Sequence, residues 1–400
     1  MPHNRAACAM RKGKSNLVYR KVNIGDRYYM RRKLLQIGGG NFIGGGRSKI
    51  IYQLCVFLNK EQYEVCYHIV NPLPDELRDS INNVLYIPQR FNNKILNLAN
   101  DSIQFVRKLR KQRFDIIHFN TDSLREQWRY IVLAIMFSKS KIVIHGHNTS
   151  SSNSDISVRV FRKVLMFALR GSVSLYLACS KEAATYLVGN KYAEKVFILP
   201  NGIPINQYEF NKNTRDALRK ELKINDKTFV IGSVGRLSKQ KNYDYLVDIV
   251  YKLKQKNIDF KLLIVGEGEL HASLQKKINE LGMDQDVILL GMRTNVNEYL
   301  QAFDVFCLTS IYEGFGIVNI EAQAAGLPCI ISDRCPQSVD VTGDVRFLSI
   351  NDSPNVWSEA IIDIMNNPYR YVKNKLIKDK GFDICDSAKK LMKLYDEILV

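Results

Sequence analysis

The sequence predicts an α/β protein of two Rossmann-like domains that face each other across a cleft. Three observations favour this class. Short runs rich in β-branched residues alternate with longer helix-patterned stretches, the rhythm of stacked βαβ units in a parallel sheet. The runs form two series, separated by a Pro-Asn-Gly-Ile-Pro turn cluster at residues 200–204. A chain of 400 residues is also long enough for two or three domains.

The first series of expected strands lies at residues 34–37, 65–70, 116–119, 142–145, 175–178 and 196–199. The second series lies at residues 229–234, 262–265, 287–290, 305–308, 329–331 and 345–348. The predicted division is a basic extension (1–32), an N-terminal domain (33–204), a C-terminal domain (205–370) and a helical segment (371–400) that packs back toward the N-terminal domain.

The basic residues are concentrated at the start of the chain. Residues 1–33 hold ten Lys or Arg and one acidic residue, which gives +9, half of the net charge of +18. Two interpretations stay open: a basic arm for a membrane or nucleic acid, or a natural start at Met30 that makes residues 1–29 non-native.

Composition narrows the class of protein. Hydrophobic residues make up 46% and charged residues 24% of the chain, as in ordinary globular proteins. The net charge favours an anionic partner: a nucleic acid, a phosphorylated small molecule or an acidic membrane.

The eight cysteines show no C-x-x-C pair and are expected to be buried thiols in a reducing cytoplasm. No apolar run reaches 18 residues and no signal-peptide pattern opens the chain, so we expect a cytoplasmic or peripheral protein.

A glycine-rich loop follows the first expected strand. Residues 38–46 contain six glycines, among them Gly44, Gly45 and Gly46, and such a loop lets backbone amides approach an anion. The spacing does not match the dinucleotide-binding fingerprint. The loop is interpreted either as a plain flexible turn or as a wall of the cleft that faces phosphate or substrate.

A second loop follows the first strand of the second series. Gly235 opens it, and Arg236 and Lys241 supply two cations at a five-residue spacing. A guanidinium fork and an ammonium point charge suit the two phosphates of a nucleotide sugar. The alternative is a solvated basic loop.

The most informative stretch follows the fourth strand of the second series. Glu313 lies in the loop and Glu321 on the helix after it, so both carboxylates can face one ligand and accept hydrogen bonds from sugar and ribose hydroxyls. The amides of Gly314, Phe315 and Gly316, with the helix N-terminus, are suited to anionic oxygens. Two solvent-facing glutamates beside a turn are the alternative.

Glu313 and Glu321 resemble the E-x7-E element of retaining GT-B glycosyltransferases of family 4, also called glycosyl transferases group 1. The resemblance covers about residues 33–370, and within the family the chain resembles bacterial capsular and exopolysaccharide enzymes. It includes the segments 199–203, 234–237 with 241–242, 265–268 and 290–293. It implies that Arg236 and Lys241 hold the donor diphosphate, that Glu313 contacts the donor sugar and that Glu321 holds the ribose.

The donor-binding residues implied by the resemblance are Arg236, Lys241, Gly266, Met292, Arg293, Glu313, Gly314, Phe315, Gly316 and Glu321. The nucleotide sugar is a co-substrate, and no metal or other cofactor is expected, because side chains and helix ends neutralise the diphosphate in such enzymes.

The N-terminal domain binds the acceptor in this family. His118 ends one expected strand, and His145 and His147 end another in a segment that resembles the His-x-His-Asn of capsule enzymes, where a histidine lies beside the reacting sugar. His147 is favoured over His145. Both join Glu313, Arg236 and Lys241 as candidate catalytic residues, and His118 joins Gly44, Gly45 and Gly46 as a candidate acceptor and phosphate site. A structural histidine is the alternative at each position.

Two helix-patterned stretches of this domain, at residues 95–113 and 157–170, mix apolar and basic residues. One interpretation is a face that rests on anionic lipid and meets a lipid-linked acceptor. The other is a solvated helix face.

The resemblance predicts retaining transfer of a sugar from a nucleoside diphosphate sugar, with UDP favoured, to a glycan acceptor in bacterial surface polysaccharide synthesis, in the cytoplasm or on the inner face of its membrane. One alternative is a non-transferring GT-B enzyme, such as a nucleotide-sugar epimerase or a phosphorylase. A basic nucleic-acid-binding protein is the remaining alternative. The chain lacks a recognisable sequence motif for nucleic-acid recognition, so nucleic acid is not expected as a partner.

Overall fold

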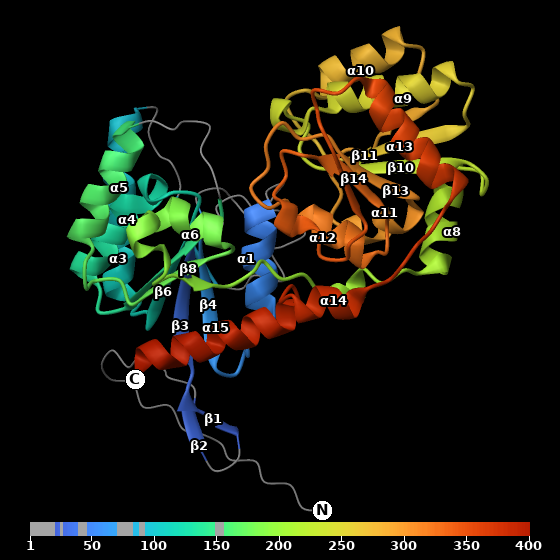
Figure 1. Cartoon of the computed structure of the whole chain (residues 1–400). Coiled ribbons are helices and arrows are strands. Elements are labelled where there is room, and N and C mark those ends of the chain that lie inside the picture. The colour runs from blue at the N-terminus through green and yellow to red at the C-terminus, as the bar shows by residue number, and fades with distance from the viewer. Residues whose placement is uncertain (1–20, 25–26, 39–45, 70–82, 88–92, 149–155) are drawn as a thin grey trace, which may run out of the picture.

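The computed structural model describes residues 21–24, 27–38, 46–69, 83–87, 93–148 and 156–400, and Figure 1 shows two α/β domains. Of the predicted basic extension, residues 1–20 lie outside these ranges. Its last part contains an antiparallel strand pair, β1 (Lys21–Ile24) and β2 (Arg27–Met30), which the sequence pattern did not predict.

The N-terminal domain has a parallel sheet of seven strands in the order β5-β4-β3-β6-β7-β8-β9. Its strands are β3 (Arg32–Ile37), β4 (Tyr63–Ile69), β5 (Val84–Tyr86), β6 (Ile116–Thr121), β7 (Lys141–Gly146), β8 (Leu175–Ala178) and β9 (Phe197–Ile198). Its described helices are α1 (Gly46–Val56), α3 (Lys94–Lys111), α4 (Leu124–Phe137), α5 (Ile156–Ala168), α6 (Lys181–Val188) and α7 (Asn190–Ala193).

The C-terminal domain has a parallel sheet of six strands in the order β12-β11-β10-β13-β14-β15. Its strands are β10 (Phe229–Val234), β11 (Phe260–Val265), β12 (Val287–Leu289), β13 (Val305–Leu308), β14 (Cys329–Ser332) and β15 (Val345–Leu348). The helices after β9 are α8 (Lys212–Glu221), α9 (Tyr243–Gln255), α10 (His271–Glu280), α11 (Val296–Ala302), α12 (Ile317–Ala324), α13 (Pro354–Asn366), α14 (Asn374–Asp379) and α15 (Ile384–Leu399), with short 3-10 turns at Ile205–Gln207, Lys239–Lys241 and Gln337–Val339.

The prediction of two parallel-sheet α/β domains is therefore confirmed. In both sheets the order reverses at the first strand, β3 or β10, so the loops beside that strand diverge and leave room for a ligand. The described loops that follow β6, β10 and β13 lie at these two switch points.

Two apolar cores enclose the N-terminal sheet. On one face, α3, α4 and α5 contribute Phe105, Ile131 and Leu165. On the other face, the core combines residues of α1 with Leu391 and Tyr395 of α15, a helix that follows the whole C-terminal domain in the sequence. Figure 1 shows α15 running back along the N-terminal domain.

The chain crosses between the domains twice, and the two crossings are bonded to each other. The Ile203 amide donates to the Phe382 carbonyl at 2.8 Å, and the Ile384 amide donates to the Ile203 carbonyl at 3.0 Å. Gly202 permits this approach, because a Cβ atom there would lie 2.7 Å from the Cα of Ile384.

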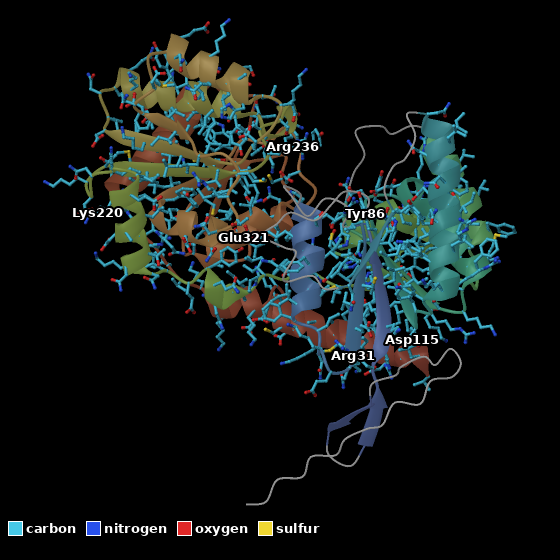
Figure 2. All side chains as sticks on the ribbon, turned by 180° about the vertical axis from the view of Figure 1, so that it is seen from behind. Arg31, Tyr86, Asp115, Lys220, Arg236 and Glu321 are labelled. Carbon is cyan, nitrogen blue, oxygen red and sulfur yellow. The ribbon has the colours of Figure 1, made fainter. Side chains whose placement is uncertain are left out.

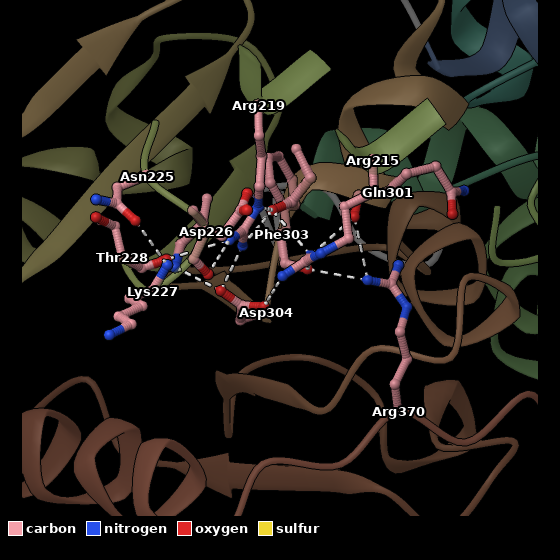
Figure 3. A network of polar contacts seen from close by, with 12 residues as sticks. Arg215, Arg219, Asn225, Asp226, Lys227, Thr228, Gln301, Phe303, Asp304 and Arg370 are labelled. Atoms are coloured by element: carbon pink, nitrogen blue, oxygen red, sulfur yellow. Dashed lines mark hydrogen bonds and ion pairs between the residues drawn. The ribbon is translucent and has the colours of Figure 1, made fainter. Parts of the chain in front are cut away.

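Three arginines bind the C-terminal end of α11, as Figure 3 shows. Arg215, Arg219 and Arg370 donate to the carbonyl oxygens of residues 300–303, which the helix leaves without intrahelical partners. Asp304 accepts from Arg215 at 2.5 Å and from Arg219 at 2.6 Å. Burial, and then the neighbouring charge of Arg215, lowers the pKa of Arg370 to about 9. This network fixes α8 and the segment after α13 to the end of α11.

No helix formed by the described residues is long and apolar enough to cross a bilayer. The cysteines among these residues are free thiols, and all are buried except Cys385. The expectation of buried thiols was therefore wrong for Cys385, which lies at an exposed position near the start of α15.

Candidate active site

The loop between β13 and α12 brings one predicted carboxylate against a predicted cation. Lys241 Nζ lies 2.5 Å from Glu313 Oε2, and the Ser310 hydroxyl donates to the same oxygen at 3.2 Å. The two charged side chains are only 13% and 11% exposed. The pair is therefore held largely out of water, where a charge interaction is stronger than at a surface.

Gly316 shapes this loop just before α12 begins. Its φ of +64° lies in the left-handed region, and a Cβ atom there would lie 2.9 Å from the Cγ of Glu313. Phe315, in contrast, packs into the core and stacks on Phe382 at 5.3 Å between ring centroids. The Phe315 side chain thus anchors the loop.

The predicted second phosphate ligand does not join this pair. Arg236 Nη2 lies 3.1 Å from Glu269, and the two side chains are 67% and 53% exposed. Exposed ion pairs of this kind contribute little free energy, so the guanidinium can leave Glu269 for an anionic ligand at small cost. Figure 2 shows Arg236 and Glu321 on the side of the C-terminal domain that faces α1.

The loops after β10 and β11 approach each other through glycine. A Cβ atom at Gly266 would lie 1.9 Å from the Gly235 carbonyl oxygen, and the Gly266 amide donates to the Gly291 carbonyl at 2.9 Å. Of the residues predicted near the base, Met292 is 51% exposed and Arg293 donates to the Leu290 carbonyl at 3.0 Å. The backbone segments around Gly235, Gly266 and Gly291 therefore lie side by side.

Glu321 lies on α12 with only 3% of its side chain exposed. Its Oε1 atom accepts from Lys49 Nζ of α1 at 2.7 Å and from the Tyr208 hydroxyl at 2.7 Å. Lys49 belongs to the N-terminal domain and Tyr208 to the first crossing, so Glu321 is where three parts of the chain meet. Sequence reasoning missed both partners.

The three predicted histidines lie in a row, with His118 within β6, His145 near the end of β7 and His147 just after it, so the expectation that His118 ends its strand was wrong. Ring centroids lie 5.4 Å apart for His118 and His145, and 4.1 Å apart for His145 and His147. His118 Nδ1 lies 2.5 Å from the Tyr395 hydroxyl, and His147 Nε2 lies 3.1 Å from Asn120 Oδ1. His118 and His145 are 1% exposed, whereas His147 is partly exposed. Of the three, His147 alone retains surface that a ligand can reach.

Burial lowers the pKa of His118 to about 3, lowers the pKa of His147 to about 3, and lowers the pKa of His145 well below 6.5. All three imidazoles are therefore neutral at pH 7. A neutral His147 can accept or donate one hydrogen bond but carries no charge for a substrate.

These shifts predict a pH dependence of stability. Below pH 6.5 these histidines bind protons in the unfolded chain, whereas in the folded chain burial keeps them unprotonated well below that pH, down to about pH 3 for His118 and His147. The free energy of unfolding should therefore fall as pH drops from 7 to 5, by up to about 1.4 kcal/mol per histidine for each pH unit below 6.5. Urea unfolding at pH 7, 6 and 5 measures this slope, and His145→Asn should reduce it. An unchanged slope in this variant would contradict the assignment.

A further ion cluster at this edge was also missed. Arg47 of α1 lies 2.8 Å from Asp122 Oδ2 and 2.8 Å from Glu126 Oε1, so it joins the start of α1 to the loop after β6. The candidate glycines Gly44 and Gly45 lie outside the described residues, and Gly46 begins α1. Within the ranges that the structure describes, no group of three or more His, Cys, Asp or Glu side chains is placed to hold a metal ion.

Known proteins resemble most of the chain. Residues 44–207 match the family model Glycosyltransferase Family 4, and residues 214–380 match Glycosyl transferases group 1. The chain is 30% identical over 310 residues, 74% of this chain and 79% of the relative, to a Bacillus subtilis protein named Putative glycosyltransferase EpsF. It is 26% identical over 373 residues, 89% of this chain and 94% of the relative, to an Escherichia coli protein named UDP-Gal:alpha-D-GlcNAc-diphosphoundecaprenol alpha-1,3-galactosyltransferase.

Among solved structures, Anabaena HepE in complex with UDP and glucose superposes with a TM-score of 0.69. The match covers 92% of this chain and 98% of HepE at 18% sequence identity. At this identity the likeness shows the fold.

Proposed function

The chain belongs to the family 4 glycosyltransferases and has their GT-B fold, and from this premise we propose that it transfers a sugar from a UDP sugar to a lipid-linked glycan with retained anomeric configuration. The observation that carries the proposal is the placement of Glu313, Lys241 and Glu321 around the start of α12. The names of the Escherichia coli relative and of the HepE complex support UDP and a diphospho-lipid acceptor.

The chemistry follows from these positions. Lys241 and Arg236 stabilise the charge that develops on the departing diphosphate, which is the main catalytic need of this reaction, and they do so without a metal ion. Glu313 accepts hydroxyl hydrogen bonds of the donor sugar, and Glu321 accepts those of the ribose. His147 lies on the acceptor side of the reacting sugar.

Retention is proposed to follow a front-face route. The bond from the anomeric carbon to the leaving phosphate oxygen breaks, the bond to the acceptor oxygen forms on the same face, and the acceptor proton passes to the phosphate. A double displacement needs a free carboxylate nucleophile beside the anomeric carbon. The acidic side chains after β6, Asp122 and Glu126, are both bonded to Arg47, which supports the front-face route.

A donor panel tests the function. We expect one of the UDP, GDP and ADP sugars to raise the unfolding temperature of the wild type, by a stabilisation of about 2.7 kcal/mol at 100 times its Kd, and to be slowly hydrolysed. Glu321→Ala should lose both responses, whereas Glu280→Ala, at an exposed position of α10, should keep them. A wild type that responds to none of these sugars would contradict the proposal. Free UDP without a glycosylated acceptor, or a requirement for phosphate, would point to an epimerase or a phosphorylase.

The outer faces of α3 and α5 support a membrane-bound acceptor. Ile95 is 75%, Val160 53%, Val164 63% and Phe167 74% exposed. Basic residues lie among them, including Arg107, Arg110, Lys111 and Lys163, which are also exposed. We propose that this mixed face rests on the anionic inner surface of the cytoplasmic membrane, because apolar side chains enter the headgroup layer while cations bind anionic lipid.

Binding of the protein to lipid vesicles tests whether this face contacts the membrane. Val164→Glu combined with Phe167→Glu should lower binding to vesicles with about 30% phosphatidylglycerol by roughly tenfold or more, since it removes buried apolar area and adds repelled charge. Val356→Glu, at an exposed valine of α13 in the other domain, is the matched control and should bind as the wild type does. Equal binding of the α5 variant and the wild type would rule out this face.

A further inference from the structure

Lys49 makes an ion pair across the domain boundary with a residue of the proposed donor site. Its Nζ atom lies 2.7 Å from Glu321 Oε1 and 3.3 Å from the Tyr208 hydroxyl oxygen. The two charged residues are 272 positions apart in the sequence. Lys49 lies one turn into α1, the helix that follows the glycine-rich loop.

The hydrogen bonds of Glu321 are unevenly shared between its two oxygens. Among the described residues, Oε1 accepts from both Lys49 and Tyr208, and no residue donates to Oε2. Burial, and then the Glu321 charge, raises the pKa of Tyr208, so its hydroxyl stays protonated and donates. A carboxylate oxygen that already accepts two donors is a poor acceptor for a third, so a ligand hydroxyl is directed to Oε2.

Because Glu321 is buried, breaking its ion pair with Lys49 is expected to be energetically unfavourable. The side chain is 3% exposed, and a buried carboxylate that loses its cation is strongly destabilised or turns toward another donor. Lys49 keeps 34% of its side chain exposed, so its own charge remains partly solvated. The cation therefore holds the Glu321 carboxylate in place and also contributes to the stability of the fold.

We propose that Lys49 is a positioning residue for donor binding: together with Tyr208 it holds Glu321 Oε1, so that Oε2 faces a ribose hydroxyl of the nucleotide. This inference rests on the proposed function, in which Glu321 binds the ribose. It adds that the acceptor domain completes the ribose site. The affinity for a nucleotide then depends on the arrangement of both domains, because α1 must lie against α12.

The test compares a ribose with a ribose that lacks one hydroxyl. Whichever of UDP, GDP and ADP binds the wild type most tightly is titrated by calorimetry, together with its 2′-deoxy form. The wild type should prefer the ribonucleotide by about tenfold, the usual effect of one hydrogen bond to a charged group. Lys49→Met should bind the ribonucleotide about tenfold more weakly and the deoxynucleotide within twofold of the wild type. The ribose preference should thus disappear.

Three further variants separate positioning from folding. Lys49→Arg should restore most of the preference, and Tyr208→Phe, which removes one donor without leaving a charge unpaired, should reduce it by about threefold. Lys60→Met, at an exposed lysine of the same domain, should behave as the wild type does. In sugar transfer, Lys49→Met should raise the KM of the donor and leave kcat within about twofold.

The outcomes distinguish the two proposals. Equal weakening of both nucleotides by Lys49→Met would mean that Lys49 acts only through the fold, and unchanged binding of both would mean that it has no role; either result overturns this inference. If Lys49→Met does not fold, an unaltered ribose preference in Tyr208→Phe overturns it instead. A wild type that binds none of the three nucleoside diphosphates would contradict the proposed function itself.

Discussion

Lys241→Ala is expected to lower kcat/KM for sugar transfer by about a thousandfold, a loss of about 4 kcal/mol of transition-state stabilisation. Two effects combine. The variant removes an ammonium that faces the departing diphosphate in the proposed mechanism. It also leaves Glu313, which is 11% exposed, without the cation that holds it 2.5 Å away.

The control for this variant lies in the same 3-10 turn. Lys239 has the same charge, belongs to Lys239–Lys241 and is exposed. Lys239→Ala should keep kcat/KM within about twofold, because its charge is screened by solvent. Steady-state kinetics with the donor found in the panel measures both. If Lys241→Ala kept more than a tenth of the wild-type value, the phosphate role of Lys241 would be wrong.

Asp304→Ala is expected to cost about 3–5 kcal/mol of unfolding free energy, the range for breaking a buried ion pair from one side. Its carboxylate accepts from Arg215, Arg219 and the Val230 amide, and the Arg219 side chain is 3% exposed. The substitution leaves the Arg219 guanidinium buried among carbonyl groups without its counter-charge. It also removes the bonds of Asp304 to Arg215 and Arg219 of α8, which Figure 3 shows, and its bond to the Val230 amide of β10.

An exposed pair in the same domain provides the comparison. Arg346 and Asp363 lie 3.2 Å apart, with side chains 50% and 67% exposed. Asp363→Ala should therefore change the unfolding free energy by about 1 kcal/mol or less. Urea unfolding, followed by tryptophan fluorescence of the buried Trp357, reports on this domain. Equal midpoints for the two variants would show that the Asp304 network does not stabilise the domain.

Most strands of both sheets were predictable because they are short, largely buried apolar runs. Every run named from the sequence overlaps a strand of the structure, from β3 to β15; residues 196, 199 and 290 lie just outside their strands, and residue 70 lies outside the described residues. The strand β5 was missed, since Val84–Tyr86 has three residues and an exposed edge position. The β1 and β2 pair was missed because the sequence analysis assigned its residues to a basic extension.

The candidate site was predictable where its members lie in short, recognisable sequence patterns. The glycine turns and the spacing of Glu313 and Glu321 are local patterns. Lys49, Tyr208 and Arg47 gave no signal, because each acts on a partner far away in the chain, and a lysine in a basic protein is unremarkable. His118 was expected at the acceptor site, but its ring points toward Tyr395 of α15, a helix whose position strand patterns do not encode.

The packing of α15 on the N-terminal sheet also sets an order of biosynthesis. The apolar face beside α1 is completed by Ala388, Leu391 and Tyr395, which leave the ribosome after both sheets have been made. At 5–20 residues per second, the stretch from β9 to α15 takes roughly 10–40 s to translate. During that interval the nascent chain exposes this face, which is where a chaperone would bind. The domain that is synthesised first is thus the one that is finished last.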